Sequence, residues 1–280
     1  MTKISNNINE TREIISKWKS QNFSIGFVPT MGYLHDGHLS LIKKSHMENN
    51  KTVVSIFVNP TQFGPKEDLS TYPRDFDADR QKCEDALVDL IFFPTAEEMY
   101  PSDYYTYVNV NYLTNNLCGR SRPNHFQGVC TVLAKLFNII KPNKAYFGQK
   151  DAQQLSVVKK MVRDLNFDLE IVGCPIIREP DGIAISSRNS YLNKEERKAA
   201  TCLSQSLKLA KELINNGECK ISFIKNSMSN LISNQTLAKI DYIEFVDLNN
   251  LQPIDTIKKS SLCAIAVYIG NTRLIDNFII

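Results

Sequence analysis

Two histidines three residues apart stand at the start of an expected helix and are the first candidates for chemistry. They lie in Pro29-Thr30-Met31-Gly32-Tyr33-Leu34-His35-Asp36-Gly37-His38, between an apolar run at 25–28 and an amphipathic stretch from residue 39. This order predicts a strand, a tight loop and a helix, the arrangement that binds phosphate groups at a helix N-terminus. The helix dipole disfavours a charged imidazole at His38. A neutral imidazole can donate an N–H to a phosphoryl oxygen whose charge grows during reaction.

Two other interpretations of this histidine pair stay open, because short motifs of this kind often occur by chance. The side chains could be metal ligands, or they could be ordinary loop and cap residues. The glycine between the histidines and the strand before them favour the phosphate site. Gly32 and Gly37 let the backbone approach a ligand closely or adopt a positive φ.

A second candidate position follows the apolar run 52–58, whose nearly continuous β-branched residues are typical of a parallel strand buried on both faces. The run ends at Asn59-Pro60-Thr61-Gln62. Ligands of open α/β sheets bind outside the carboxyl ends of the strands, so Asn59 and Gln62 are candidates for substrate contacts. A plain Asn-Pro turn is the alternative.

A second glycine-led helix start follows a short expected strand at 145–147. Gly148-Gln149-Lys150-Asp151 precedes a helix expected from about residue 152 to residue 165. Lys150 offers a compact positive charge for a phosphate. Asp151 could accept hydrogen bonds from ribose hydroxyls or simply cap the helix, and Gln154 faces the same end of the sheet one turn later.

A third cluster of donors and charge is Ser186-Ser187-Arg188, which follows turn residues at 179–182. Two hydroxyls beside a guanidinium suit a triphosphate, although such a tripeptide alone carries little information. Arg120, Arg122 and His125 form a looser group, which could either line an anion site or be loop charges.

The elements that must position these residues predict an α/β protein in two domains. Strands alternate with helices up to about residue 175, which favours a Rossmann-like parallel sheet in residues 1–176. Helices at 194–216 and 220–233 are followed by strands at 241–248 and 262–269, which favours a smaller α+β domain in residues 177–280. The other expected elements are a helix at 8–20, strands at 90–94, 107–110 and 169–175, and a helix at 129–140.

Composition narrows the function class. With 42% hydrophobic and 22% charged residues, the chain fits a soluble globular protein, and a net charge of +3 is too slight to indicate a nucleic-acid partner. We expect no membrane segment, since no run of about 18 apolar residues occurs. Seven scattered cysteines without C-x-x-C spacing favour inert thiols and a cytoplasmic location. The absence of a Walker A string disfavours a P-loop ATPase.

Several separated strings resemble one known family. His-x-Gly-His opening a helix is similar to the nucleotide signature of class I aminoacyl-tRNA synthetases and nucleotidylyltransferases. The longer Pro-Thr-Met-Gly-x-Leu-His-x-Gly-His resembles the pantothenate synthetase (pantoate–β-alanine ligase) family. So do Asn-Pro-x-Gln-Phe at 59–63, Arg-Pro-x-His-Phe-x-Gly-Val at 122–129, Asp-Gly-x-Ala-x-Ser-Ser-Arg-Asn at 181–189 and the segment 271–277. Ile185 stands where that family usually has Met.

The resemblance implies ATP-dependent condensation of pantoate with β-alanine to pantothenate through a pantoyl adenylate, with release of AMP and pyrophosphate. It also implies Mg²⁺, a homodimer and a second domain that covers the active site. No residue is assigned as a metal ligand, and no covalent nucleophile is needed. The implied catalytic residues are His35, His38, Lys150 and Arg188, and the implied pantoate and β-alanine contacts are Gln62 and Gln154. The implied ATP-binding residues are Met31, Gly32, Tyr33, Leu34, His35, Asp36, Gly37, His38, Gly148, Gln149, Lys150, Asp151, Ile177, Ile185, Ser186, Ser187 and Arg188.

Two alternative functions remain at this point. A nucleotidylyltransferase would leave the nucleotide joined to its product and would never acylate an amine. A non-catalytic nucleotide- or RNA-binding module would lack ATP turnover. The weak net charge and the lack of a basic patch interleaved with aromatic residues speak against the module.

Overall fold

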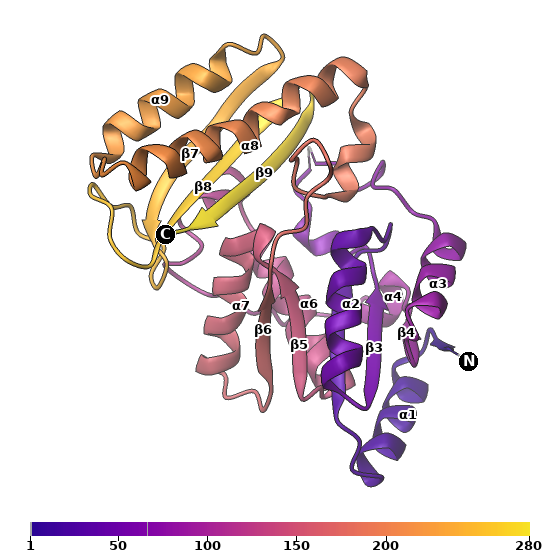
Figure 1. Cartoon of the computed structure of the whole chain (residues 1–280). Coiled ribbons are helices and arrows are strands. Elements are labelled where there is room, and N and C mark those ends of the chain that lie inside the picture. Colours follow the sequence, from indigo (N-terminus) through magenta and orange to yellow (C-terminus); the bar gives the residue numbers. More distant parts are fainter. Residues whose placement is uncertain (1, 66) are drawn as a thin grey trace. The chain divides into compact units, whose positions relative to one another are not determined.

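The computed structural model describes residues 2–65 and 67–280, and the chain divides into two compact units (Figure 1). The first unit comprises Met1–Val110, Arg122–Gln149 and Val157–Pro175. The second comprises Asn111–Ser121, Lys150–Ser156 and Ile176–Ile280. The sequence suggested a single boundary near residue 176, and the contacts add the two short earlier segments to the second unit.

Within the described residues, the first unit is built on a parallel sheet of six strands in the order β1-β4-β3-β2-β5-β6. The central strands are rich in apolar residues because helices cover both faces of the sheet. The expected Rossmann-like parallel sheet is therefore confirmed. Its strands are β1 (Lys3–Ser5), β2 (Ile25–Thr30), β3 (Lys51–Ile56), β4 (Leu90–Phe92), β5 (Lys144–Gly148) and β6 (Glu170–Cys174).

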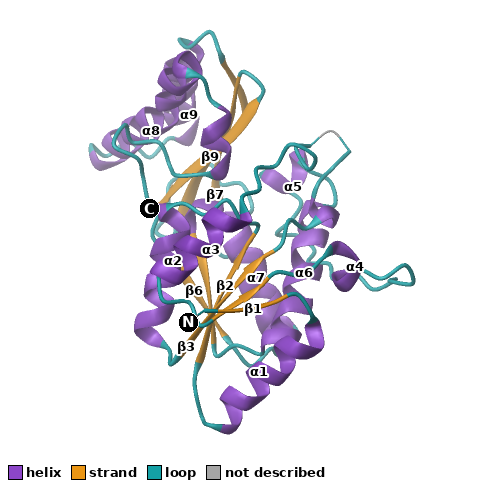
Figure 2. Cartoon of the chain, turned by 90° about the vertical axis from the view of Figure 1, so that its right-hand side faces the viewer, coloured by secondary structure: helices purple, strands orange, loops and turns teal. Residues whose placement is uncertain are grey.

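Helices lie on both faces of this sheet, with α2 on one side and α1 and α6 on the other (Figures 1 and 2). Neighbouring residues of β2 point to opposite faces. Phe27 meets Phe137 of α6 edge-on at 6.4 Å between ring centroids, whereas Val28 packs in a cluster with Leu41 and Ile42 of α2. The helices in this part of the chain are α1 (Ile8–Ser20), α2 (Asp36–Glu48), η1 (Pro60–Gln62), α3 (Phe76–Asp85), α4 (Ala96–Met99), α6 (His125–Ile140), η2 (Gln149–Asp151) and α7 (Ala152–Asp164). Of these, the end of η2 and the start of α7 belong to the second unit.

The strand order creates a switch point beside β2. The chain proceeds from β2 outward to β3 and β4, then crosses back to place β5 on the other side of β2. Connections that leave neighbouring strands in opposite directions open a crevice at the carboxyl ends, where ligands of such sheets bind. The loops after Thr30, Ile56 and Gly148 all begin at this edge.

The second unit contains an antiparallel sheet with the order β7-β8-β9. Two long helices pack on one face of it, where Leu207 and Met228 meet Phe245 and Ile265 in a buried cluster (Figure 1). The expected α+β character is confirmed. The elements are α5 (Cys118–Ser121), η3 (Ser187–Tyr191), α8 (Lys194–Asn215), α9 (Ile221–Ser233), β7 (Ala238–Asp247), β8 (Ser261–Ile269) and β9 (Thr272–Ile279).

Two local expectations differ from the structure, and two strands were not expected. The predicted strand at 107–110 is wrong, because this alternating segment pairs with no strand in the described structure and Val108 instead donates its N–H to Thr131 Oγ1 at 3.0 Å. Strands β1 and β9 carry no strong pattern of their own, and pairing with β4 and β8 creates them. Helix α6 begins at His125, four residues before its apolar run.

Candidate active site

The predicted phosphate loop connects β2 to α2. Gly32 and Tyr33 both adopt positive φ, at 82° and 51°. Glycine is required at the first position, since a Cβ there would lie 2.8 Å from an oxygen of Asp79. Helix α2 begins at Asp36 with His35 as its N-cap, which confirms that His38 lies in the first turn.

The contacts of His38 define its tautomer. The backbone N–H of His35 donates to Nδ1 of His38 at 3.3 Å. An Nδ1 that accepts this bond carries no proton, so the ring proton of a neutral His38 is on Nε2. The two imidazoles are stacked with 4.0 Å between their centroids. In this tautomer, Nε2 carries the donor N–H of the ring.

Helix α3 holds the other side of this loop. Asp79 is only 2% exposed, and its two carboxylate oxygens accept the N–H groups of Tyr33 and Leu34 at 2.7 and 2.6 Å. Lys82 donates from Nζ to the carbonyl oxygen of Leu34 at 2.6 Å. Burial raises the pKa of Asp79, although the two N–H groups and the charge of Lys82 oppose the rise.

Sequence reasoning overlooked Asp79 and Lys82, yet a signal for Asp79 was present. Phe76, Asp79 and Cys83 follow the i, i+3, i+7 spacing of one helix face, and Asp79 and Cys83 are buried. A carboxylate on an otherwise buried helix face is unusual unless hydrogen bonds satisfy it. The pattern marks a buried polar contact but does not identify the loop that makes it.

Gln62 lies at the carboxyl edge of β3, the neighbour of β2. Its side chain is largely buried and accepts a hydrogen bond from Nδ2 of Asn59 at 3.1 Å. Its amide nitrogen is 3.2 Å from the sulfur of Met31. The structure thus brings together two residues that the sequence had placed on separate loops, one expected to bind pantoate and one expected to bind ATP.

Arg122 and His125 support the segment that carries Gln62. Arg122 makes a two-pronged ion pair with Glu67, with both distances 2.7 Å, and contacts Nε2 of His125 at 2.9 Å. Nδ1 of His125 lies 2.9 Å from the carbonyl oxygen of Gln62. Burial alone would raise the pKa of Glu67, but the hydrogen bonds and charge of Arg122 hold it below its usual value.

Arg120 has a different place from Arg122. It belongs to the second unit, where it lies 3.6 Å from Glu244 and is half exposed. Arg122 and His125 belong to the first unit, and an anion site formed by the three residues stays a prediction.

The close approach of α6 to η1 yields the first prediction. A Cβ at Gly128 would lie 2.4 Å from the backbone oxygen of Thr61 and 2.6 Å from Cα of Gln62. We expect Gly128→Ala to destabilise the protein by about 1–3 kcal/mol, as overpacking does. We also expect it to raise the KM for pantoate, because the added methyl group would displace Gln62, an expected pantoate contact. Thermal melts and steady-state kinetics measure the two effects. Gly64→Ala is the matched control, since its Cβ would make only an ordinary contact 3.7 Å from Glu67. Equal melting temperatures and equal KM values in the two variants would contradict this prediction.

The glycine-led start after β5 divides between the units. Gly148 and Gln149 belong to the first unit, and a Cβ at Gly148 would meet no atom within 4 Å. Lys150 belongs to the second unit, where Asn277 donates from Nδ2 to its carbonyl oxygen at 2.8 Å. Its ammonium lies 3.5 Å from Asp151, too far for a strong pair. Gln154 follows on α7 and is half-buried.

The Ser-Ser-Arg segment is part of a folded hairpin in the second unit. Ile185 donates its N–H to the carbonyl oxygen of Ile177 at 3.0 Å, so these two expected ATP-binding residues are adjacent. Ser186 caps η3 and accepts the N–H of Arg188 at 3.3 Å. Ser187 is buried, and Arg188 is half-buried.

Ion pairs fix the base of this hairpin. Arg178 donates to both carboxylate oxygens of Asp276 on β9, at 2.6 and 2.9 Å, and the Asp276 side chain is 1% exposed. Arg197 of α8 pairs with Glu179 and, at 2.7 Å, with Asp181 in the turn. The backbone that presents Ser186 to Arg188 is therefore anchored to the sheet and to α8.

Other features of the described residues supply no competing site. The cysteines are free, six of the seven are buried, and burial raises the pKa of Cys83 and of Cys130 to about 12, as expected for inert thiols. Residues 2–65 and 67–280 contain no group of three or more His, Cys, Asp or Glu able to hold a metal ion. In the same residues, no helix combines the length and apolar character needed to cross a bilayer.

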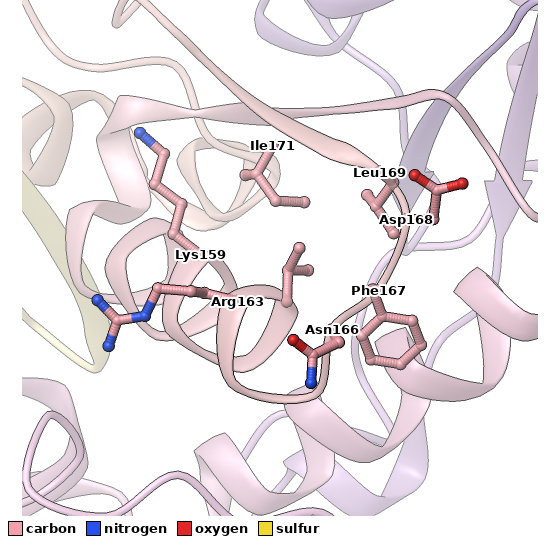
Figure 3. A pocket seen from close by; sticks show the side chains of 8 residues that line it. Lys159, Arg163, Asn166, Phe167, Asp168, Leu169 and Ile171 are labelled. Atoms are coloured by element: carbon pink, nitrogen blue, oxygen red, sulfur yellow. The ribbon is translucent and has the colours of Figure 1, made fainter.

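A hollow of about 560 Å³ lies beside the start of β6 (Figure 3). This is the end of the sheet opposite the carboxyl edge, and none of the expected site residues lines it. Its walls are Lys159, Val162, Arg163, Asn166, Phe167, Asp168, Leu169 and Ile171.

Comparison with known proteins agrees with this geometry. The family described as pantoate-beta-alanine ligase matches residues 3–279. A pantothenate synthetase of Clostridium botulinum (strain Loch Maree / Type A3) is 62% identical over 98% of both chains. A crystal structure of pantothenate synthetase from Thermus thermophilus has a TM-score of 0.94 at 42% identity, over 99% of both chains. A pantoate-beta-alanine ligase from Francisella tularensis, crystallised with beta-gamma ATP and beta-alanine, has a TM-score of 0.82 at 36% identity, over 100% of this chain and 98% of that one.

Proposed function

The chain belongs to the pantoate–beta-alanine ligase family, and from that premise we propose how its residues perform the reaction. The reaction is the ATP-dependent condensation of pantoate with β-alanine to pantothenate. The observation that best supports our assignment of roles is the histidine pair at the start of α2, with His38 held as a donor. Neither the nucleotidylyltransferase nor the non-catalytic module is supported by the comparisons.

In the first step, a carboxylate oxygen of pantoate attacks the α-phosphorus of ATP. The bond from that phosphorus to the bridging oxygen breaks, and pyrophosphate leaves with the electron pair. The products are pantoyl adenylate and pyrophosphate. His38 donates from Nε2 to a phosphoryl oxygen as its charge grows, and His35 steadies the phosphates beside it.

In the second step, the amine of β-alanine attacks the activated acyl carbon. The tetrahedral intermediate expels AMP, the nitrogen loses a proton, and an amide remains. No enzyme nucleophile is needed, because the adenylate itself is the activated acyl group. Catalysis consists of positioning and charge stabilisation. Gln62 and Gln154 hold pantoate, and Gln62 also contacts β-alanine.

The remaining roles concern the nucleotide. Lys150 and Arg188 neutralise phosphate charge, with Ser186 and Ser187 as hydroxyl donors. Asp151 accepts from the ribose, Ile177 contacts the adenine, and Ile185 is a further ATP contact. The other backbone and side-chain contacts of ATP come from the phosphate loop and from the start of η2, at Met31, Gly32, Tyr33, Leu34, Asp36, Gly37, Gly148 and Gln149.

Magnesium enters our scheme as part of the substrate, Mg-ATP. Mg²⁺ keeps several waters and is usually held by substrate phosphates with one or two carboxylates. A site built from three or more protein ligands is therefore not required. We further propose that the protein acts in the cytoplasm as a homodimer, in line with its seven free cysteines and with the family resemblance.

Isotope transfer tests the adenylate route. With pantoate labelled by ¹⁸O in its carboxylate, attack on the α-phosphorus must leave one labelled oxygen in AMP once the amine displaces it. We expect mass spectrometry to find that label in AMP, and none when unlabelled pantoate reacts in ¹⁸O water. Label in pyrophosphate or phosphate would show attack at another phosphorus and would exclude the adenylate. AMP that accumulates while pantothenate does not form would contradict the ligase scheme.

A further inference from the structure

Helix α3 carries two charged side chains that the reaction scheme leaves unused. Asp79 is buried at 2% exposure, and a carboxylate is expensive to bury unless it is fully hydrogen-bonded. Its carboxylate oxygens accept hydrogen bonds from the backbone nitrogens of Tyr33 and Leu34, at 2.7 and 2.6 Å. These donors lie 46 and 45 residues away in the sequence, so the contact exists only in the folded chain.

The geometry of the loop explains why an anion belongs there. Gly32 and Tyr33 have consecutive positive φ values, and successive N–H groups around such a turn form a concavity that binds anions. In this protein the chain's own Asp79 occupies that concavity. The N–H groups of Tyr33 and Leu34 are therefore used to fix the loop.

Lys82 acts on the next peptide unit. Its Nζ donates to the carbonyl oxygen of Leu34 at 2.6 Å, while the N–H on the other side of that peptide, from His35, donates to Nδ1 of His38 at 3.3 Å. A trans peptide is planar, with its C=O and N–H pointing in opposite directions. Fixing the oxygen of the Leu34–His35 peptide therefore also fixes the direction in which its N–H points.

We propose that Asp79 and Lys82 are positioning residues that fix the Leu34–His35 peptide and thereby hold His38 as its Nε2–H tautomer. Both act through the loop backbone, without touching a substrate. The N–H of the Leu34–His35 peptide donates to Nδ1 of His38, so Nδ1 carries no proton and the ring proton is on Nε2. Without the two side chains the peptide can rotate, and the imidazole exchanges between tautomers. The inference rests on the proposed role of His38 for its effect on rate, but its structural part can be tested alone.

Nitrogen NMR of the full protein reads the tautomer directly. The chain has only four histidines, so ¹⁵N-histidine labelling gives few signals, and His38→Ala assigns those of His38. We expect wild-type His38 to show an unprotonated Nδ1 and a protonated Nε2. In Asp79→Asn and Lys82→Met, both nitrogens should move towards the averaged positions of an exchanging imidazole. Asp77→Asn, an exposed carboxylate on the same helix, should leave the signals unchanged.

Kinetics on the same variants supply the second readout. We expect kcat to fall by about tenfold to a hundredfold, as for a misplaced catalytic group, while the KM for β-alanine stays within about twofold. A general loss of folding would instead lower the active fraction without moving the nitrogen signals of the folded molecules. If Asp79→Asn does not fold, Lys82→Met carries the test. Unchanged His38 signals in the folded variants would overturn the proposal. So would a kcat equal to that of Asp77→Asn in a protein whose His38→Ala variant is impaired. Shifted signals together with a fully active His38→Ala would support the positioning role and remove His38 from the mechanism.

Discussion

Replacing His38 by alanine is expected to lower kcat by about 10²–10³ while the protein stays folded, because one preorganised donor to the growing phosphoryl charge is lost. The loss should appear already in the first step, as slow release of pyrophosphate from ATP and pantoate. The KM values should change little, since a donor that acts mainly in the transition state contributes little to ground-state binding.

His46→Ala is the matched control for this variant. His46 lies on the same helix α2, but it is exposed in the last turn. It should keep wild-type kinetics, and the melting temperatures of both variants should be close to that of the wild type. A loss of less than tenfold in His38→Ala would show that His38 does not act on the phosphates.

Replacing Lys150 by methionine is expected to lower kcat for pyrophosphate release by about 10²–10³, because a single positive charge on the leaving phosphates is lost. The ammonium has only a weak contact with Asp151 at 3.5 Å, so it is not committed to a strong ion pair within the protein. The backbone should survive the change, since Asn277 holds the main-chain carbonyl of residue 150 and not its side chain. Pre-steady-state measurement of pyrophosphate release at saturating ATP tests this.

Lys159→Met controls for the change in net charge. Lys159 is an exposed residue on α7 and is not among the expected site residues. It should leave the rate within about twofold of the wild type, as surface substitutions away from a site usually do. Equal activity of the two methionine variants would exclude Lys150 from phosphate binding. Lys150→Arg should recover only part of the rate, because the planar guanidinium cannot reproduce a compact ammonium.

Local pattern in the sequence was sufficient for most of the fold. The apolar runs that became β2, β3 and β8 and the periodic stretches that became α1, α7 and α8 have the lengths and spacings of buried strands and amphipathic helices. The two glycine-led helix starts fall at the carboxyl edge of the sheet because a strand–loop–helix order leaves no other place for them. His38 in the first turn of α2 follows from the same reasoning.

Only the tertiary structure decided which residues hold that site in place. Asp79 and Leu34 are 45 residues apart, and Arg122 and Glu67 are 55 apart, and no periodic pattern links residues at such separations. The segment 107–110 alternates like a strand but pairs with none of the described strands. Strand β1, by contrast, is only three residues long and pairs with β4. A sequence pattern records which face of an element is apolar. Hydrogen-bond partners depend on which elements meet, and that is determined when the whole chain packs.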